Sequence, residues 1–385
     1  MSERSNEPRH RRVVLKVGTN LLTGGGERLD RAIMRSIAAQ AAEAHRAGCE
    51  IILVTSGAIA AGRDRLATLA SAGEDEAIRL PHHLTRRQVL AAIGQGPLLS
   101  LWDELLAAHS ITIAQALLGG ADLADRQGYL NARNTLLALL DIGVVPIVNE
   151  NDVVSVEEIQ DATIGDNDSL SAHVANLVDA DLLLMLTDIA GLYSADPSRD
   201  AEARLIERVD HINAAIEAAA RGPGTRGRGG MRTKVEAARL ATQSGAHAVI
   251  ADGRRPHVVR DAVRGESVGT WFAPTTDRLE SRRRYLLSPM HVQGTITIDD
   301  GAVRALVRHS RSLLPAGIVA TRGNFERGHV VRIESREGEH IASGRANYGA
   351  EDLRRISGGH SDRIEELLGY DYGDEAVHRD NLVLV

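Results

Sequence analysis

Short apolar runs alternate with longer amphipathic runs over the first two-thirds of the chain. The apolar runs "RRVVLKVG" and "EIILVTSG" predict two strands, and further strands start at Ile111, Val144 and Leu182. The run "RAIMRSIAAQAAEAHRAG" from Arg31 has helical periodicity and a glycine stop at Gly48. This alternation predicts an α/β domain with a mainly parallel open sheet flanked by helices.

The pattern changes after about Trp271. The stretch "APTTDRLESRRRYLLSP" combines two prolines with a charge run and predicts a linker. Beyond it, "GTITIDDGA", "GIVATRGNFERGHVVRIES" and "HIASGRANYG" predict short strands of a small β-barrel-like domain. The chain therefore divides into a disordered N-terminal tail (1–12), an α/β domain (13–273), a linker (274–290), the small β domain (291–369) and a C-terminal tail (370–385).

Composition and charge narrow the class of protein. At 385 residues, with 43% hydrophobic and 25% charged residues, the chain has the composition of a globular protein of two or three domains. A net charge of −7 gives no basic signature of a nucleic-acid binder. The single cysteine, Cys49, excludes an internal disulfide framework. There is no signal-peptide pattern and no membrane-spanning run, so we expect a cytoplasmic protein without a membrane partner.

Lysine is nearly absent from the chain. Of the 45 basic residues only Lys16 and Lys234 are lysines. Chance survival is one explanation, and a need for a compact ammonium at both positions is the other. Lys16 lies at the end of the first predicted strand, where an ammonium is costly unless it reaches a polar site. Lys234 lies in the first turn of a helix that starts at Met231, which favours the second explanation.

The glycine-rich stretch before Met231 predicts an anion site. "GPGTRG" matches the dinucleotide fingerprint, yet it follows a helical run instead of a strand, and no Walker A motif exists. Within "GTRGRGGMRTK", free backbone N–H groups, a helix N-terminus and the Lys234 ammonium suit a phosphate. A mobile linker is the alternative interpretation of this stretch.

Polar groups follow several of the predicted strands, and "IGDNDSLSA" adds an acidic cluster. Each group alone is typical of a turn or a helix cap, and Ser169 could itself cap the helix after the cluster. In a parallel sheet, however, strand carboxyl ends line one crevice. Ammonium, carboxylate, amide and hydroxyl groups there would suit phosphoryl transfer to a small zwitterion. The groups are Ser56, Gly57, Asn149, Asn151, Asp152, Asp166, Asn167, Asp168, Thr187 and Asp188.

Seven short segments of the sequence, which contain most of these residues, together resemble the amino acid kinase family. In chain order they are "LKVGTNLLT", "ILVTSGAIAAG", "LNARNTL", "PIVNEND", "GDNDSLSA", "LMLTDIAGLYSADP" and "GGMRTK". "LLPAGIVATRGNFERG" and "GYDYGDEAVHRD" resemble the PUA domain and tail of one branch of that family. The resemblance covers about Val13 to Asp380 and implies ATP-dependent phosphorylation of the γ-carboxylate of L-glutamate, the first step of proline biosynthesis.

The resemblance also implies roles for single residues. Lys16, Lys234 and Asp168 are the implied catalytic residues, with Asp168 orienting the two lysines. Glutamate would be bound by Ser56, Gly57, Asn149, Asp152, Asp166 and Asn167. ATP would be bound by Lys16, Thr187, Asp188, Arg228, Gly229, Gly230, Met231, Arg232, Thr233 and Lys234. Mg²⁺ would bridge the ATP phosphates, and no residue is assigned as its ligand.

The resemblance further implies a homo-oligomer, feedback by proline and hand-over of the product to the next enzyme of the pathway. Three stretches depart from the family pattern. Arg228 and Arg232 replace Thr and Ser of the usual "TGGMSTK" loop, and the segment from Val153 to Thr163 is longer than usual. The insert "ATLASAGEDEAIRLPHHLTRR" is divergent and receives no role.

Two alternatives stay open at this point. One is another kinase of the same fold, acting on aspartate, acetylglutamate or a nucleotide. The other is an RNA-binding protein, because PUA domains accompany RNA-modifying enzymes. Balanced charge between His291 and Gly369, with only Phe325 and Tyr348 as aromatic residues there, argues against strong RNA affinity.

Overall fold

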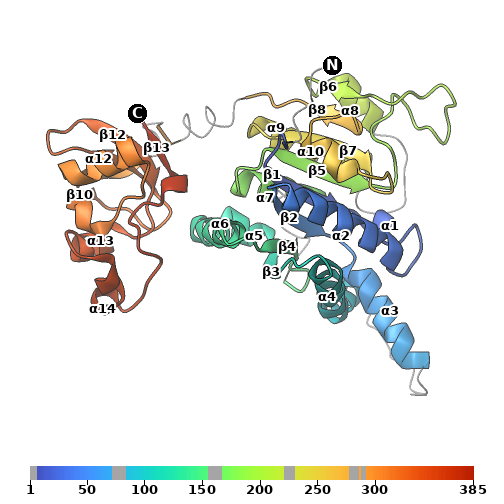
Figure 1. The fold of residues 1–385 in the computed structure, drawn as a ribbon, viewed down its shortest axis with the longest axis horizontal. Coiled ribbons are helices and arrows are strands. Elements are labelled where there is room, and N and C mark those ends of the chain that lie inside the picture. The colour runs from blue at the N-terminus through green and yellow to red at the C-terminus, as the bar shows by residue number, and fades with distance from the viewer. Residues whose placement is uncertain (1–6, 72–83, 155–166, 221–229, 277–285, 288–291) are drawn as a thin grey trace. The chain divides into compact units, whose positions relative to one another are not determined.

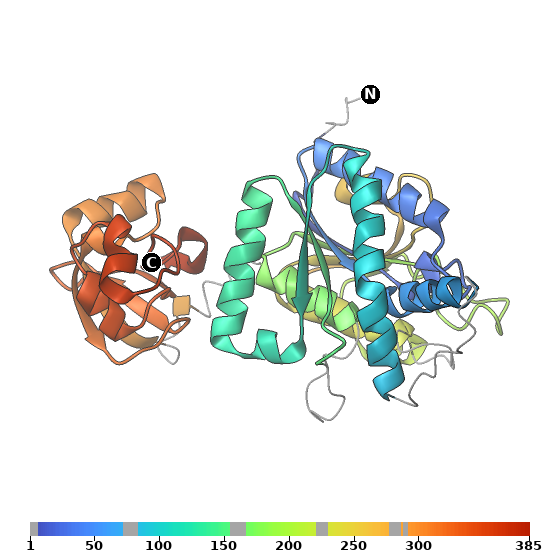
Figure 2. The same cartoon turned by 90° about the horizontal axis from the view of Figure 1, so that it is seen from below.

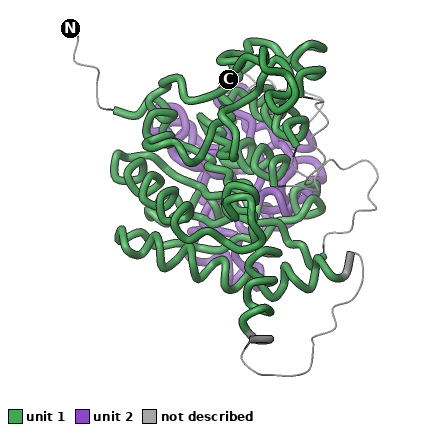
Figure 3. Tube along the Cα trace, turned by 90° about the vertical axis from the view of Figure 1, so that its right-hand side faces the viewer, with its two compact units in different colours: residues 1–124, 131–276 green, residues 125–130, 277–385 purple. Residues whose placement is uncertain are grey.

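The computed structural model describes residues 7–71, 84–154, 167–220, 230–276, 286–287 and 292–385. The chain forms two compact units, one of residues 1–124 and 131–276 and the other of residues 125–130 and 277–385 (Figure 3). None of the helices in the described part of the chain has both the length and the hydropathy needed to cross a membrane.

The first unit is built on an eight-stranded sheet with the order β3-β4-β2-β1-β5-β7-β8-β6 (Figure 1). All neighbouring strands pair in parallel except β7 and β8. The sheet confirms the predicted mainly parallel α/β class. Its strands are β1 (Arg12–Val17), β2 (Glu50–Thr55), β3 (Ile113–Leu118), β4 (Val145–Glu150), β5 (Leu182–Thr187), β6 (Arg208–Val209), β7 (His247–Asp252) and β8 (Gly269–Phe272).

Helices connect these strands and cover both faces of the sheet. They are α1 (Thr19–Leu22), α2 (Arg31–Arg46), α3 (Ala58–Ser71), α4 (Leu84–Ala107), α5 (Gly120–Ala124), α6 (Arg126–Asp141), α7 (Asn167–Leu177), α8 (Ala214–Ala220), α9 (Met231–Gln243) and α10 (Val258–Val263). Helix α2 begins at Arg31, as predicted, and Asp30 is its N-cap: the Asp30 carboxylate accepts hydrogen bonds from the N–H groups of Ala32 and Ile33.

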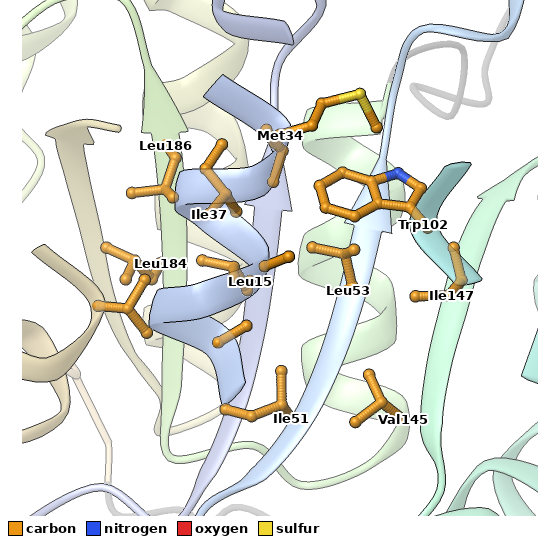
Figure 4. Close-up of a cluster of buried hydrophobic side chains, with 14 of the residues drawn as sticks. Leu15, Met34, Ile37, Ile51, Leu53, Trp102, Val145, Ile147, Leu184 and Leu186 are labelled. Carbon is orange, nitrogen blue, oxygen red and sulfur yellow. The ribbon is translucent and has the colours of Figure 1, made fainter. Parts of the chain in front are cut away.

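Alternation along β1 assigns its residues to the two faces of the sheet. Leu15 packs with Met34 and Ile37 of α2 and with Trp102 of α4 in one hydrophobic core (Figure 4). Successive side chains of a strand point to opposite faces, so Lys16 lies on the other face. That face carries α7 and α9, which contact β1 and β7 respectively.

Helices α3 and α4 cross closely beside the carboxyl end of β2 (Figure 2). Glycines make this crossing possible: a Cβ on Gly94 would lie 1.8 Å from the carbonyl oxygen of Ala58, and one on Gly62 would lie 2.0 Å from that of Leu90. The crossing fixes the start of α3, and therefore the turn that carries Ser56 and Gly57.

The second unit contains a five-stranded sheet with the order β10-β9-β11-β12-β13. Its elements are β9 (Val292–Ile298), α12 (Asp300–His309), β10 (Ile318–Gly323), β11 (Val330–Glu334), β12 (His340–Arg345), α13 (Ala350–Ile356), α14 (Ile364–Leu368) and β13 (Leu382–Leu384). "GTITIDDGA" is a strand only as far as Ile298, because the Asp299 carboxylate caps α12 by accepting from the N–H of Ala302. The segment predicted as a C-terminal tail contributes β13, which pairs with β12.

The predicted disordered tail, 1–12, needs a correction over its last residues. The N–H groups of Arg9 and His10 both donate to the carbonyl of Val263, and β1 already begins at Arg12. His10 is buried against His247 and Trp271. Residues 1–6 lie outside the described residues.

Candidate active site

A cavity of about 420 Å³ lies at the carboxyl edge of the first unit's sheet. Strands β1, β2, β4 and β5 end there, as parallel strands of one sheet must. The predicted residues that line it are Lys16, Ser56, Gly57, Asn149, Asp152, Asn167, Asp168, Thr187, Asp188 and Lys234. The structure therefore brings together residues that are up to 218 positions apart in the chain.

Lys16 reaches the cavity from the middle of the sheet. Its Cα is paired with Val54 of β2 on one side and with Met185 of β5 on the other. The side chain is only 4% exposed, so its ammonium needs an anionic partner. Asp168, at the second position of α7, provides it: Nζ of Lys16 donates to Oδ1 of Asp168.

Asp168 is the centre of a buried network. Its Oδ2 accepts from Nζ of Lys234 at 3.2 Å and from Oγ1 of Thr233 at 2.7 Å. Burial on its own would raise the pKa of Asp168, but the ammonium groups of Lys16 and Lys234 outweigh it and hold the pKa far below its usual range. The carboxylate is thus ionised throughout the physiological range and fixes two ammonium groups beside the cavity.

Asp168 does not act as a helix cap. Helix α7 begins at Asn167, so Ser169 lies inside it and not at the cap position predicted from the sequence. Both carboxylate oxygens of Asp168 face side chains from other elements, β1 and α9. Of the acidic cluster, Asp166 lies outside the described residues.

Ser56 and Asn167 form one wall of the cavity. The Asn167 amide Nδ2 donates to Oγ of Ser56 at 3.1 Å, whereas the buried Oδ1 of Asn167 accepts no hydrogen bond from the described residues. Gly57 follows with φ of 106°, a conformation that favours glycine, and a Cβ there would lie 3.1 Å from Leu29. A free acceptor and a glycine turn are features suited to an amino-acid ligand.

Asp152 also lines the cavity and carries a perturbed carboxyl group. Burial and the neighbouring Glu150 raise its pKa to about 6, while Arg87 acts in the opposite direction. Asn149 is held in place by donating from Nδ2 to Gln95 at 2.8 Å. An acid with this pKa favours a cationic ligand group, because a neighbouring ammonium would restore its charge.

The predicted nucleotide residues divide into two groups. Thr187 and Asp188 line the cavity, with Oγ1 of Thr187 3.1 Å from Oδ1 of Asp188. Gly230 is the N-cap of α9, and Met231, Arg232 and Thr233 form the first turn with Lys234. Arg232 is exposed and pairs with Glu236 at 2.9 Å. Arg228 and Gly229 lie outside the described residues.

The described residues offer no cage for a metal ion. No group of three or more His, Cys, Asp or Glu side chains comes together among them. The Asp168 oxygens are already taken by Lys16, Thr233 and Lys234. A cation that enters with its own phosphate ligands fits this cavity better than a protein-bound one.

The sequence matches the Amino acid kinase family over residues 11–252. The chain belongs to the amino acid kinase family. A second match, to the PUA domain, covers residues 294–368. The chain is 47% identical to "Glutamate 5-kinase" of Dehalococcoides mccartyi strain CBDB1, over 99% of this chain and all of that protein. It is 49% identical to "Glutamate 5-kinase" of Herpetosiphon aurantiacus, over 97% of this chain and 98% of that protein.

Sequence reasoning missed several residues of this amino acid kinase site. Arg63 of α3 and Arg87 of α4 line the cavity, as do Glu27 and Glu150. The position of Arg63, one helical turn after Ile59, follows from the helical period once α3 is placed after the Ser56 turn. The contact of Thr233 with Asp168 had no such signal, because the hydroxyl lies in a loop motif assigned to the nucleotide.

Proposed function

We propose that this amino acid kinase transfers the γ-phosphoryl group of ATP to the γ-carboxylate of L-glutamate. The products are ADP and L-glutamyl 5-phosphate, and the reaction is the first step of proline biosynthesis. The observation that carries the proposal is the pair of buried ammonium groups, Lys16 and Lys234, held by Asp168 at the edge of the cavity. The two relatives named above, both called glutamate 5-kinase, support the choice of acceptor.

In the reaction, an oxygen of the γ-carboxylate forms a bond to the γ-phosphorus while the bond from that phosphorus to the β-phosphate oxygen breaks. The acceptor is already an anion, so no general base is required, and no proton needs to leave it. Lys16 and Lys234 would stabilise the negative charge on the transferring group. Asp168, whose pKa is far below its usual range, would stay ionised and keep both ammonium groups in position.

The remaining side chains of the cavity would orient the two substrates. Asp152 and Oδ1 of Asn167, which has no donor among the described residues, would accept from the glutamate ammonium, and Ser56 and Gly57 would donate to its α-carboxylate. Asn149 and Asp166 are further residues proposed to bind glutamate. Thr187, Asp188 and the residues 228–234 would hold the nucleotide. Bound Mg²⁺ would neutralise charge on the ATP phosphates.

A further part of the proposal concerns what happens to the product. An acyl phosphate hydrolyses readily, so hand-over to the next enzyme of the pathway would protect it. Proline feedback and a homo-oligomer belong to the same proposal. Sedimentation of the purified chain and inhibition of turnover by L-proline test these two points separately from catalysis.

An acceptor screen tests the reaction. ADP release from MgATP is measured with L-glutamate, L-aspartate, N-acetylglutamate and UMP, and hydroxylamine traps any acyl phosphate as a hydroxamate. We expect ADP release and hydroxamate only with L-glutamate. Faster turnover with another acceptor would replace glutamate in this proposal, and no acceptor-dependent turnover at all would refute it.

A further inference from the structure

Arg327, in the second unit, is a buried arginine that forms no ion pair within the described part of the chain. It lies between β10 and β11 and is only 9% exposed. Its Nε is buried and donates no hydrogen bond to the described residues. Burial lowers its pKa, and the groups that oppose this shift are the phenols of Tyr372 and Tyr348, with no carboxylate among them. Arginine is rarely buried unless it is paired, so this position needs a reason.

Tyr372 orients the guanidinium group without using its donors. The guanidinium carbon of Arg327 lies 3.9 Å from the centroid of the Tyr372 ring. A guanidinium stacked on a ring keeps its N–H groups in its own plane, where they match the two oxygens of a carboxylate or phosphate. Stacking therefore prepares Arg327 for bidentate recognition of an oxyanion.

Tyr348 holds the Tyr372 backbone in place. The Tyr348 side chain is fully buried, and its hydroxyl accepts from the N–H of Tyr372 at 2.8 Å. The same hydroxyl lies 2.6 Å from the carbonyl of Gly373 and 2.9 Å from Asp371. Asp371 also accepts from the N–H of Gly373, so this carboxylate is engaged within its own turn. The turn that carries Tyr372 is thus held in place without a ligand.

The rings of Tyr370 and Tyr372 form an exposed aromatic surface beside Arg327. Their centroids are 5.1 Å apart, and the two residues are 40% and 43% exposed. Flat ligands stack well on such rings, at low cost in side-chain entropy. The ligand is therefore expected to carry a planar ring, which stacks on this surface, in addition to the oxyanion that Arg327 would bind.

Asn347 supplies a second, independent observation. Its side chain is 1% exposed, and its Oδ1 accepts no hydrogen bond from the described residues. The segment that carries it is joined to the Arg327 loop by the hydrogen bond from Gly328 N–H to the Ala346 carbonyl, 2.8 Å long. This amide oxygen can only accept a hydrogen bond, so it does not contact an oxyanion; it marks the segment beside the Arg327 loop as incompletely hydrogen-bonded among the described residues.

We propose that Arg327, Tyr370 and Tyr372 bind a small aromatic oxyanion, that is, a phosphate or carboxylate attached to a planar ring. The oxyanion accepts hydrogen bonds from Nε and one terminal nitrogen of Arg327, and the ring stacks on the two tyrosines. This site lies in the second unit and involves none of the residues of the kinase cavity. The proposal is therefore independent of the proposed reaction.

Calorimetric titration of the full chain tests the site. Phenyl phosphate, benzoate and inorganic phosphate are each titrated into the wild-type chain and into an Arg327 variant, so that any heat from binding in the kinase cavity is common to both and is subtracted. We expect an aromatic probe to bind with a stoichiometry of one and at least ~10-fold more tightly than inorganic phosphate. Tighter binding of phenyl phosphate than of benzoate assigns a phosphate ligand, and the reverse assigns a carboxylate.

Variants of Arg327 and a matched control decide the assignment. Arg327→Gln should weaken the aromatic probe at least ~10-fold, because it removes the charge-assisted hydrogen bonds. Arg327→Lys keeps the charge but loses the planar fork, so it should also weaken binding. It takes the place of the glutamine variant in this test if that variant fails to fold. The control is Arg332→Gln: its Nε is also buried without a hydrogen bond, but it lies 3.8 Å from Glu334. Equal affinity in wild type and a folded Arg327 variant, or no binding of either aromatic probe, overturns the proposal.

Discussion

Nζ of Lys234 lies 3.2 Å from Oδ2 of Asp168, a carboxylate that is 99% removed from solvent and that also binds Lys16. This relationship places both lysines of the chain on one side chain. Every other basic residue in the sequence is an arginine. We infer that lysine is retained at these two positions because a compact ammonium fits a closed space where a guanidinium does not.

Lys16→Arg and Lys234→Arg test this explanation. We expect each substitution to lower kcat at least ~10²-fold, because the planar guanidinium cannot occupy the position of the ammonium beside the phosphoryl group. Arg239→Lys, on the same helix as Lys234 and paired with Glu217, is the matched control and should leave kcat unchanged. Near-normal turnover in either lysine variant would return that lysine to chance survival.

Asp168→Asn tests the role of the carboxylate. Asparagine keeps the shape but removes the negative charge that Asp168 places beside two buried ammonium groups. We expect kcat to fall at least ~10²-fold, with a smaller change in KM for glutamate and a loss of up to ~3 kcal/mol in unfolding free energy.

Asp179→Asn is the control for that stability loss, because Asp179 pairs at 2.5 Å with the buried Arg133 and neither residue lines the cavity. It should lower the unfolding free energy without lowering kcat. A destabilised Asp168→Asn enzyme with normal kcat would leave Asp168 with a structural role alone.

The raised pKa of Asp152, about 6, predicts a pH-dependent KM. Below pH 6 the carboxyl group becomes protonated and loses its attraction for the glutamate ammonium. KM for glutamate should therefore rise as the pH falls from 7 to 5, while kcat at saturating glutamate changes less.

Asp152→Asn should raise KM and remove this pH dependence. The folded state binds more protons than the unfolded state between the ordinary pKa of 3.8 and about 6, so stability is lost as the pH rises through that window. The variant should therefore be at least as stable as wild type at pH 7.5. If KM for glutamate in Asp152→Asn had the same value and pH dependence as in the wild type, Asp152 would have no role in glutamate binding.

The buried His10 should make the stability of the fold sensitive to acid. Burial, and then the neighbouring His247, lower the pKa of His10 from 6.5 to about 4. The unfolded chain binds the extra proton between these values, so the unfolding free energy should fall as the pH decreases from 6.5 to 4. His10→Phe should reduce this slope, measured by urea unfolding at several pH values. The exposed His211→Phe should leave it unchanged, and an unchanged slope in His10→Phe would contradict the assignment.

The sequence predicted the elements whose signal is local. Strands β1, β2, β4 and β5 are apolar runs with turn residues after them, and their polar ends could be assigned to one sheet edge from topology alone. The strand predicted over "GTITIDDGA" includes the helix start at Asp299, although an aspartate three residues before "AVRALV" is also a helix-start signal. The strand signal and the helix-start signal compete at this point, and the structure has the helix cap.

The contacts within the cavity could not be predicted in the same way. The hydrogen bonds of Asn149 with Gln95 and of Thr233 with Asp168 join residues 54 and 65 positions apart. Their partners depend on how α4 packs beside β4 and α9 beside α7, which no local pattern specifies. The roles of Lys16, Asp168 and Lys234 came from the family resemblance, and the structure supplies their distances.

Lys16, Asp168 and Lys234 lie far apart along the chain, which affects when the site can form during synthesis and folding. Lys16 and Asp168 are 152 positions apart, and Asp168 and Lys234 are 66 apart. Local helices can form early in folding, whereas contacts between distant residues wait for loop closure. β1 takes its place between β2 and β5 only after the chain up to residue 187 is available. On the ribosome, a nascent chain therefore remains catalytically silent until α9 has emerged, however much of its helical content has already formed.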